Sequence, residues 1–239
     1  GTNALTTQNF TSATNAYNVG IGYAAGTAIT TGVQNTIIGG TAGDALTDAD
    51  FNVAIGYNAL SSDTLGNRSV AIGYETLKAQ NFTSATSSNN TAVGFHAGND
   101  VTTGNNNTLI GANSGDKLTS GNSNTAMGYL ALTTDTLGDR AVAIGVNALA
   151  TQNFTSSTDN YNVGIGYQAG YSITTGIQNT LIGGLAGDAI NTGDNNVAVG
   201  MASLSVLTTA DDNVAVGVSA LSSNLTGASN TAVGRSSLA

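Results

Sequence analysis

The sequence predicts an all-β fold, a parallel β-roll or β-solenoid with 17-residue rungs. A motif of asparagine, Val or Thr, a small or apolar residue, an aliphatic residue and glycine recurs along all 239 residues, as at residues 52–56. Its glycines are evenly spaced except for two longer gaps, from Gly73 to Gly94 and from Gly145 to Gly166. Three 17-residue rungs and one 21-residue rung make a 72-residue superperiod. Self-similarity at a short fixed period indicates stacked structural repeats.

Each motif is expected to form one short strand. The first column after the asparagine is Val or Thr, and the third is Ile, Val or Met, which suits a strand. The column between them, as at Gly20, Ile37 and Ala54, is small or apolar too. Because successive side chains of a strand point to opposite faces, burial is expected on both faces. We expect the Ile/Val column to fill the roll and another copy of the chain to cover the Ala/Leu column.

The rest of each rung is expected to contain turns and a second strand. The asparagine column suits a turn and an amide ladder between rungs, and only Ser69 and Ala141 interrupt it. After the motif glycine comes a second short pair, Ala-Gly in two rungs and then Ala-Leu or Thr-Leu in the next two, as at residues 25–26 and 59–60. This pair predicts a second, narrower strand in each rung.

The longer rungs carry an insertion that reads Asn-Phe-Thr in each of three copies. Loops carry binding more often than the scaffold that positions them. The candidate receptor-contact residues are therefore Asn9, Phe10, Asn81, Phe82, Asn153 and Phe154. The alternative, which we favour for the phenyl rings, is that they fold back over a rung edge, since exposed phenyl groups are costly in water.

Composition excludes several classes of function. The net charge is −9 and the five basic residues are scattered, so the basic footprint that nucleic-acid binding needs is missing. No apolar run is long enough to predict a membrane span in this segment. Proline and cysteine are absent and no linker interrupts the repeat. Residues 1–239 are therefore predicted to form one domain, a segment of a longer fibre protein.

The sequence offers little for catalysis, and no enzyme, cofactor or metal site is predicted. His96 is the only histidine, and Ala24 and Gln168 replace it in other copies, so no catalytic triad depends on it. Asp44, Asp116 and Asp188 share one place in the superperiod, but glycine followed by aspartate favours a turn over a calcium site. A hexapeptide acyltransferase would need three hexapeptides per coil, whereas this chain supplies one.

Two further surfaces are open to a ligand-binding interpretation. The residue after the motif glycine is aromatic at Tyr23, Tyr57, Tyr74, Phe95, Tyr129 and Tyr167. This series is either a lateral sugar-binding strip or a row of packed turn residues. Thr-Thr-Gly turns occur once per superperiod and suggest, as an alternative function, a solenoid that binds glycans or ice.

The motif at residues 52–56, with its relatives at residues 69–73 and 230–234, resembles the head repeats of trimeric autotransporter adhesins. The long rungs with Thr-Thr-Gly turns also look like stretches of phage tail-fibre and other virion fibre proteins. The adhesin resemblance covers essentially the whole chain and implies a left-handed parallel β-roll packed as a homotrimer about one axis. The length of the rungs and the superperiod depart from the usual pattern of those heads.

Together these observations predict a non-enzymatic fibre body, extracellular, on a cell surface or on a virion. It would act as a rigid trimeric spacer and present an adhesive surface to a host receptor or glycan. Three copies would let weak contacts hold a target through avidity.

Overall fold

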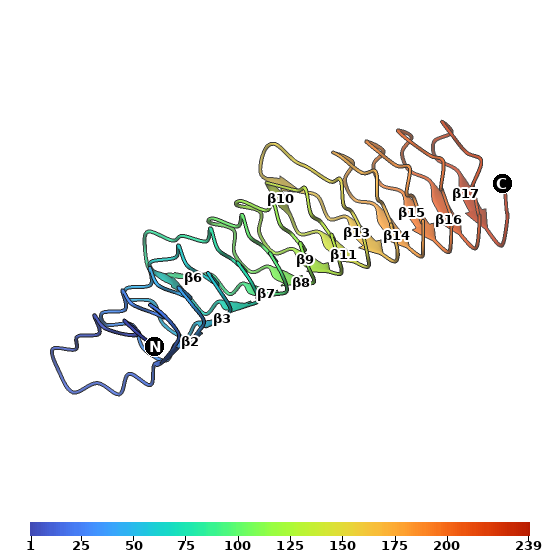
Figure 1. Cartoon of the computed structure of the whole chain (residues 1–239). Helices are drawn as coiled ribbons and strands as arrows, with labels where there is room; N and C mark the ends of the chain where they lie inside the picture. The colour runs from blue at the N-terminus through green and yellow to red at the C-terminus, as the bar shows by residue number, and fades with distance from the viewer. The chain divides into compact units, whose positions relative to one another are not determined.

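A computed structural model describes the whole chain, residues 1–239, as β-strands and turns without a helix. It contains two compact units, Gly1–Asn122 and Ser123–Ala239. Each unit is a parallel β-solenoid with one three-residue strand per rung, and each such strand pairs in parallel with that of the next rung (Figure 1). The predicted fold class is confirmed.

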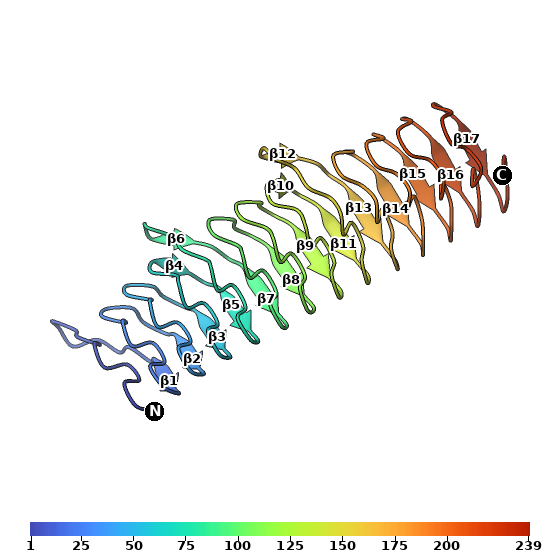
Figure 2. The ribbon, with the colours of Figure 1, turned by 45° about the horizontal axis from the view of Figure 1, so that its top comes forward.

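The strands of the first unit are β1 (Val19–Ile21), β2 (Thr36–Ile38), β3 (Val53–Ile55), β4 (Gly66–Asn67), β5 (Val70–Ile72), β6 (Thr86–Ser87), β7 (Thr91–Val93) and β8 (Thr108–Ile110). Those of the second unit are β9 (Thr125–Met127), β10 (Gly138–Asp139), β11 (Val142–Ile144), β12 (Thr158–Asp159), β13 (Val163–Ile165), β14 (Thr180–Ile182), β15 (Val197–Val199), β16 (Val214–Val216) and β17 (Thr231–Val233). Figure 2 shows the three-residue strands of each unit following one another rung by rung.

The insertion does not disturb the register of the main sheet. Val53 pairs with Val70 across a short rung, and Val70 pairs with Thr91 across a rung that carries the insertion. The extra residues bulge to the side, where β4 pairs with β6 in the first unit and β10 with β12 in the second. The repeat therefore absorbs the insertion without shifting which side chains face inward.

The predicted second strand is wrong, because the chain turns there. Residues 57–60, like the matching segment of other rungs, form turns. Asn58 and Leu60 have left-handed backbone angles, with φ of 52° and 55°. Alternating left-handed residues turn the chain tightly, so this segment is not extended, although the N–H of Leu60 still donates to the carbonyl of Thr76 in the next rung at 3.0 Å. The apolar pair is a buried corner of the rung.

The corner glycines and leucines match the size of the inward strand residue. Leu109, fully buried, lies so close to Gly98 and Gly115 that a Cβ there would sit 2.7 and 2.6 Å from its methyl groups. At Gly164 the corner leucine occupies the space beside the strand, because a Cβ on this glycine would lie 2.8 Å from Cγ of Leu149. A large side chain on the strand thus faces a glycine corner, and a glycine on the strand faces a leucine. This complementarity keeps the interior close-packed through the superperiod.

The motif glycine is required by a close approach of backbones. Gly56 has a φ of 138°, and a Cβ on it would lie 2.1 Å from the carbonyl oxygen of Gly73. An L-residue is strained at that φ and its side chain would overlap the next rung. The glycine column is therefore what lets the rungs stack at the turn.

The asparagine ladder is confirmed. The backbone N–H of Asn52 donates to Asn35 Oδ1 at 2.9 Å, and Asn52 Nδ2 donates to the carbonyl of Gly66, also at 2.9 Å. Asn52 Oδ1 in turn accepts from the N–H of Ser69 at 2.8 Å. These bonds satisfy an amide that is fully buried, since an unpaired amide there would destabilise the fold.

Candidate interaction face

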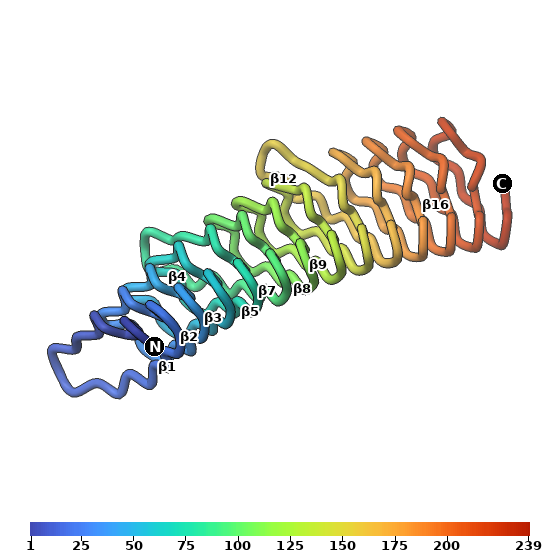
Figure 3. The backbone as a smooth tube through the Cα atoms, in the orientation of Figure 1, coloured from blue at the N-terminus to red at the C-terminus, as the bar shows by residue number.

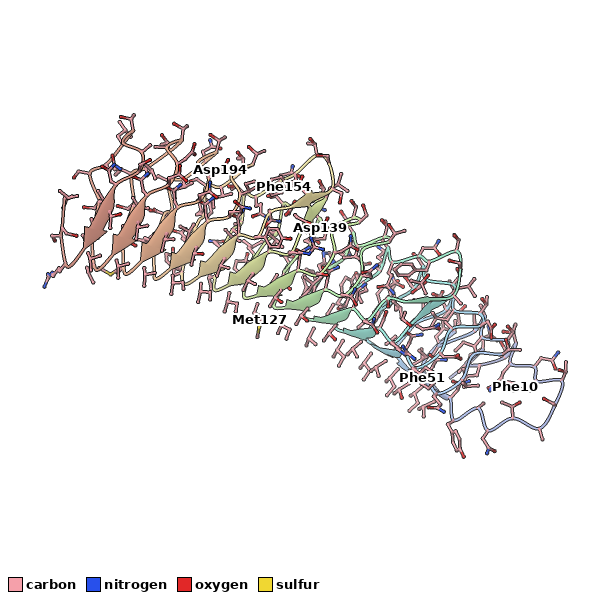
Figure 4. The ribbon with its side chains drawn as sticks, turned by 180° about the vertical axis from the view of Figure 1, so that it is seen from behind. Phe10, Phe51, Met127, Asp139, Phe154 and Asp194 are labelled. Carbon is pink, nitrogen blue, oxygen red and sulfur yellow. The ribbon has the colours of Figure 1, made fainter.

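The outward side of the main strands is apolar and uncharged. We call it the strand face: the side chains of the first and third residues of each three-residue strand. They are Val or Thr in the first place and Ile or Val in the third, with Met127 the one exception. Val19, Ile21 and Met127 are exposed, and Figure 4 shows Met127 projecting away from the coil. No ionisable side chain lies on this face, although the chain carries fourteen acidic and five basic residues.

The expected assignment of the two faces of the strand is wrong. The Ala/Leu column, expected to be covered by another copy, is buried within the chain, and Ala54 and Leu109 are fully buried. The Ile/Val column, expected to fill the roll, is partly exposed, as at Ile55 and Ile110. Both columns are apolar, so sequence alone could not tell which one faces the small interior. Packing decides it, because the narrow coil accommodates alanine on most rungs.

Aromatic residues border the strand face on both sides. In three rungs the outward positions read aromatic, valine, isoleucine and tyrosine in order, at residues 17–23, 51–57 and 161–167. The border side chains Tyr17, Tyr23, Phe51, Tyr57, Tyr161 and Tyr167 are all exposed. Large amphipathic rings beside an apolar centre are typical of surfaces that bind another protein.

The aromatic series after the motif glycine packs as a ladder in the first unit. The rings of Tyr57 and Tyr74 stack at 5.5 Å between centroids, and those of Tyr74 and Phe95 at 5.4 Å. Rings that stack on one another have their faces occupied, leaving mainly edges and hydroxyls for solvent. The three rings are therefore ordered by one another, but all three remain exposed and form an aromatic row on the surface.

His96 lies at the end of this ladder beside Glu75. Its ring stacks on Phe95 with centroids 4.1 Å apart, and Nε2 lies 3.3 Å from Glu75 Oε2. Burial raises the pKa of Glu75, but the hydrogen bonds and charges of Lys78, Asn58 and His96 outweigh it and hold that pKa below its usual value. No nucleophile is paired with His96, and the ion pair of this cluster joins Lys78 Nζ to Glu75 Oε1 at 3.1 Å.

The insertion loops place their candidate residues differently. Phe82 and Phe154 are buried, so these two rings cannot touch a receptor. Phe10 is only partly buried, on a blue loop that stands away from the first rungs (Figures 3 and 4). Asn9, Asn81 and Asn153 are exposed. Any receptor contact at the second and third loops would therefore have to use the asparagines and their polar neighbours.

Sequence reasoning missed the buried network that anchors these loops. Asp63 Oδ1 accepts from the N–H groups of Gly66 and Phe82 at 3.1 Å, and Gln80 Nε2 donates to Asp63 Oδ2 at 2.6 Å. The second unit repeats this network with Asp135, Gln152 and Phe154. Burial raises the pKa of Asp135, and the hydrogen bonds from Gln152 and the backbone only partly oppose it.

A sequence signal for this network existed. The same inward column holds Ile29 and Leu46 and then changes to Asp63 and Gln80 at the rungs that flank the insertion. Acidic and amide residues in an otherwise aliphatic column indicate a buried polar network. The exchange recurs one superperiod later.

The aspartates considered as calcium ligands are dispersed along the coil. Burial raises the pKa of Asp44 and of Asp188, and Asp116 lies 3.3 Å from Lys117 Nζ. No group of three or more His, Asp or Glu side chains comes together in a way that would hold a metal ion. The Thr-Thr-Gly turns at residues 30–32 and 102–104 lie four rungs apart in the first unit and form no continuous array.

The chain was also compared with known proteins. Family models, curated proteins and solved structures give no match. No helix of the chain could cross a lipid bilayer.

Proposed function

We propose that this chain is the body of a structural fibre whose strand faces pack against one another in a homotrimer. One observation carries the proposal: in a chain with a net charge of −9, the outward face of every main strand is apolar or threonine and carries no charge. An exposed apolar surface of this regularity is a common mark of a protein interface. A second copy supplies the matching surface, because each copy carries the same stripe at the same rung spacing.

The size of the strand face fits stable association. Six strands spaced about 4.8 Å apart, with a width of about 20 Å for the outward segment of each rung, give the first unit roughly 600 Å². The second unit has seven such strands and presents a similar area. A standard interface buries about 800 Å² per partner. The strand face of one unit therefore supplies about three quarters of the area of a standard contact.

The function that follows is mechanical and adhesive. Hydrogen-bonded rungs make a stiff scaffold, and association would cover the strand face while leaving the insertion loops outside. Repeated copies of the same loops would then contact a receptor on a host cell through many weak bonds. The resemblance to adhesin heads and virion fibres favours an extracellular, cell-surface or virion location for this body.

Native mass measured by light scattering tests the proposal. We expect about three chain masses for the wild type, and a shift to one chain mass for a variant with Ile55→Asp and Ile165→Asp, one substitution in each unit. The matched control carries Ser62→Asp and Ser156→Asp, because these add the same two charges, one in each unit, at exposed sites off the strand face. A wild-type chain that is monomeric at high concentration overturns the proposal, as does a control that dissociates equally.

A further inference from the structure

Two arginines occupy the same place in successive superperiods, beside the insertion loops. Arg68 and Arg140 lie one superperiod apart, and both have left-handed backbone angles, with φ of 62° and 63°. Their surroundings differ at three places, because Phe51, Ser87 and Asn89 beside Arg68 correspond to Ser123, Asp159 and Tyr161 beside Arg140. Arg68 Nη1 donates to Ser87 Oγ at 3.1 Å, whereas Arg140 forms an ion pair with Asp159, the equivalent of Ser87.

The equivalence of the two loop positions is set by register. Ser87 pairs with Asn67 in the short sheet of β4 and β6, and Asp159 pairs with Asp139 in that of β10 and β12. In the second unit, therefore, the arginine at this position binds a carboxylate. In the first unit Lys78 and Lys117 are paired with carboxylates, and Arg68 is the cation without one.

The surroundings of Arg68 suit a sugar ring that carries the carboxylate. The guanidinium lies over the exposed Phe51 ring, with Cζ 5.9 Å from the ring centroid, so the uncovered part of the ring provides an apolar edge beside the cation. On the other side, Asn89 Nδ2 donates to the carbonyl of Ser87 and to Asn106 Oδ1, each at 3.2 Å. Exposed amides and a hydroxyl can bind sugar hydroxyls, and guanidinium is the group best shaped for a carboxylate. We call Phe51, Arg68, Ser87, Asn89 and Asn106 the Arg68 patch.

We propose that the Arg68 patch binds a carboxylated saccharide, such as a hexuronate or a sialate, with Arg68 on the carboxylate. The second unit has no such site, because Asp159 neutralises Arg140 and fills the same place. One ion pair with a few hydrogen bonds on an open surface gives a dissociation constant on the order of 1 mM, so useful binding would come from several copies acting together. The proposal names the ligand class of the fibre proposed above, but the binding can be measured whatever the oligomeric state.

Titration calorimetry or NMR with trigalacturonate and with sialyllactose tests this site. Their neutral counterparts, methyl-esterified trigalacturonate and lactose, are the ligand controls. We expect one site per chain for at least one acidic probe and at least tenfold weaker binding of its neutral counterpart. Arg68→Gln should abolish this binding. Ser87→Asp should abolish it as well while leaving Arg68 in place, because it copies the arrangement that the second unit already has.

The converse substitution tests the comparison between the units. Asp159→Ser should remove the carboxylate partner of Arg140 while its hydrogen bond to Tyr161 Oη at 3.2 Å remains, so we expect a second, weaker site for the acidic probe in the second unit. Absence of binding by both acidic probes overturns the proposal, and so does unchanged affinity in Ser87→Asp. Equal binding of a glutamate-containing peptide overturns the assignment to a saccharide. Native mass, measured in parallel, reports separately on self-association, so either proposal can fail alone.

Discussion

Adjacent residues of β8 give a sharp test of which side of the strand faces the interior. Leu109 is fully buried against the corner glycines, and Ile110 is partly exposed on the strand face. Replacing a buried leucine by alanine costs about 2–5 kcal/mol. Leu109→Asp also buries a carboxyl group among apolar side chains, and the free-energy cost of desolvating that group adds to the loss. We therefore expect a loss of about 5 kcal/mol or more in the free energy of unfolding.

That loss is comparable with the whole stability of an ordinary domain, roughly 5–15 kcal/mol. Ile110→Asp keeps the interior intact and should cost the isolated chain about 1 kcal/mol, the scale of an exposed strand substitution. Far-ultraviolet circular dichroism during thermal denaturation, with native mass measured beside it, separates the two effects. Leu109→Asp should lose the β-sheet signal, whereas Ile110→Asp should keep that signal and lose native mass. A folded Leu109→Asp chain beside an unfolded Ile110→Asp chain would refute the packing described above.

Three further predictions concern stability, each checked by thermal or chemical denaturation. Gly56→Ala should destabilise the first unit by more than the roughly 1–3 kcal/mol of a strained backbone, because its Cβ meets the next rung, whereas Gly184→Ala, with nothing within 4 Å, should change stability by less than about 0.5 kcal/mol. Phe154→Ala should cost about 3–5 kcal/mol as a buried ring, and Phe10→Ala much less. Because the pKa of Asp135 is raised in the folded chain, its contribution to stability is full below the ordinary carboxyl pKa of 3.8 and is lost as pH rises through the folded pKa. The melting temperature of Asp135→Asn should decline less over that interval than that of the wild type, and an identical decline would contradict this assignment.

The sequence predicts the strands well because each strand is specified by a five-residue motif and that motif recurs along the whole chain. Position, parallel pairing and rung length all follow from the spacing of the motif glycines, and the asparagine ladder follows from the asparagine column. The predicted second strand is absent because residues such as Leu60 are apolar yet adopt left-handed angles, and apolarity says nothing about φ. The inside and outside of the strand were reversed because both columns are apolar, so only packing volume distinguishes them.

The candidate loops combine residues with different surroundings. The sequence favours phenyl rings that fold back over a rung edge, and Phe82 is buried while Asn81 stays exposed. The deciding partner is Asp63, which lies in the preceding rung and whose carboxylate holds the loop backbone. The pairing of Arg68 with Ser87 likewise spans an insertion, so it could not be anticipated before the register of β4 and β6 was known.

The register that survives the insertion has a consequence for how such a chain can change length. Because Val70 pairs with Thr91 as regularly as Val53 pairs with Val70, a rung sees the same neighbour whether or not a loop intervenes. Duplicating or deleting one whole superperiod in the gene would join one rung to an equivalent rung, with the corner sizes still matched. The length of the coil could thus change by whole superperiods, with the pairing of the main strands kept across each new junction.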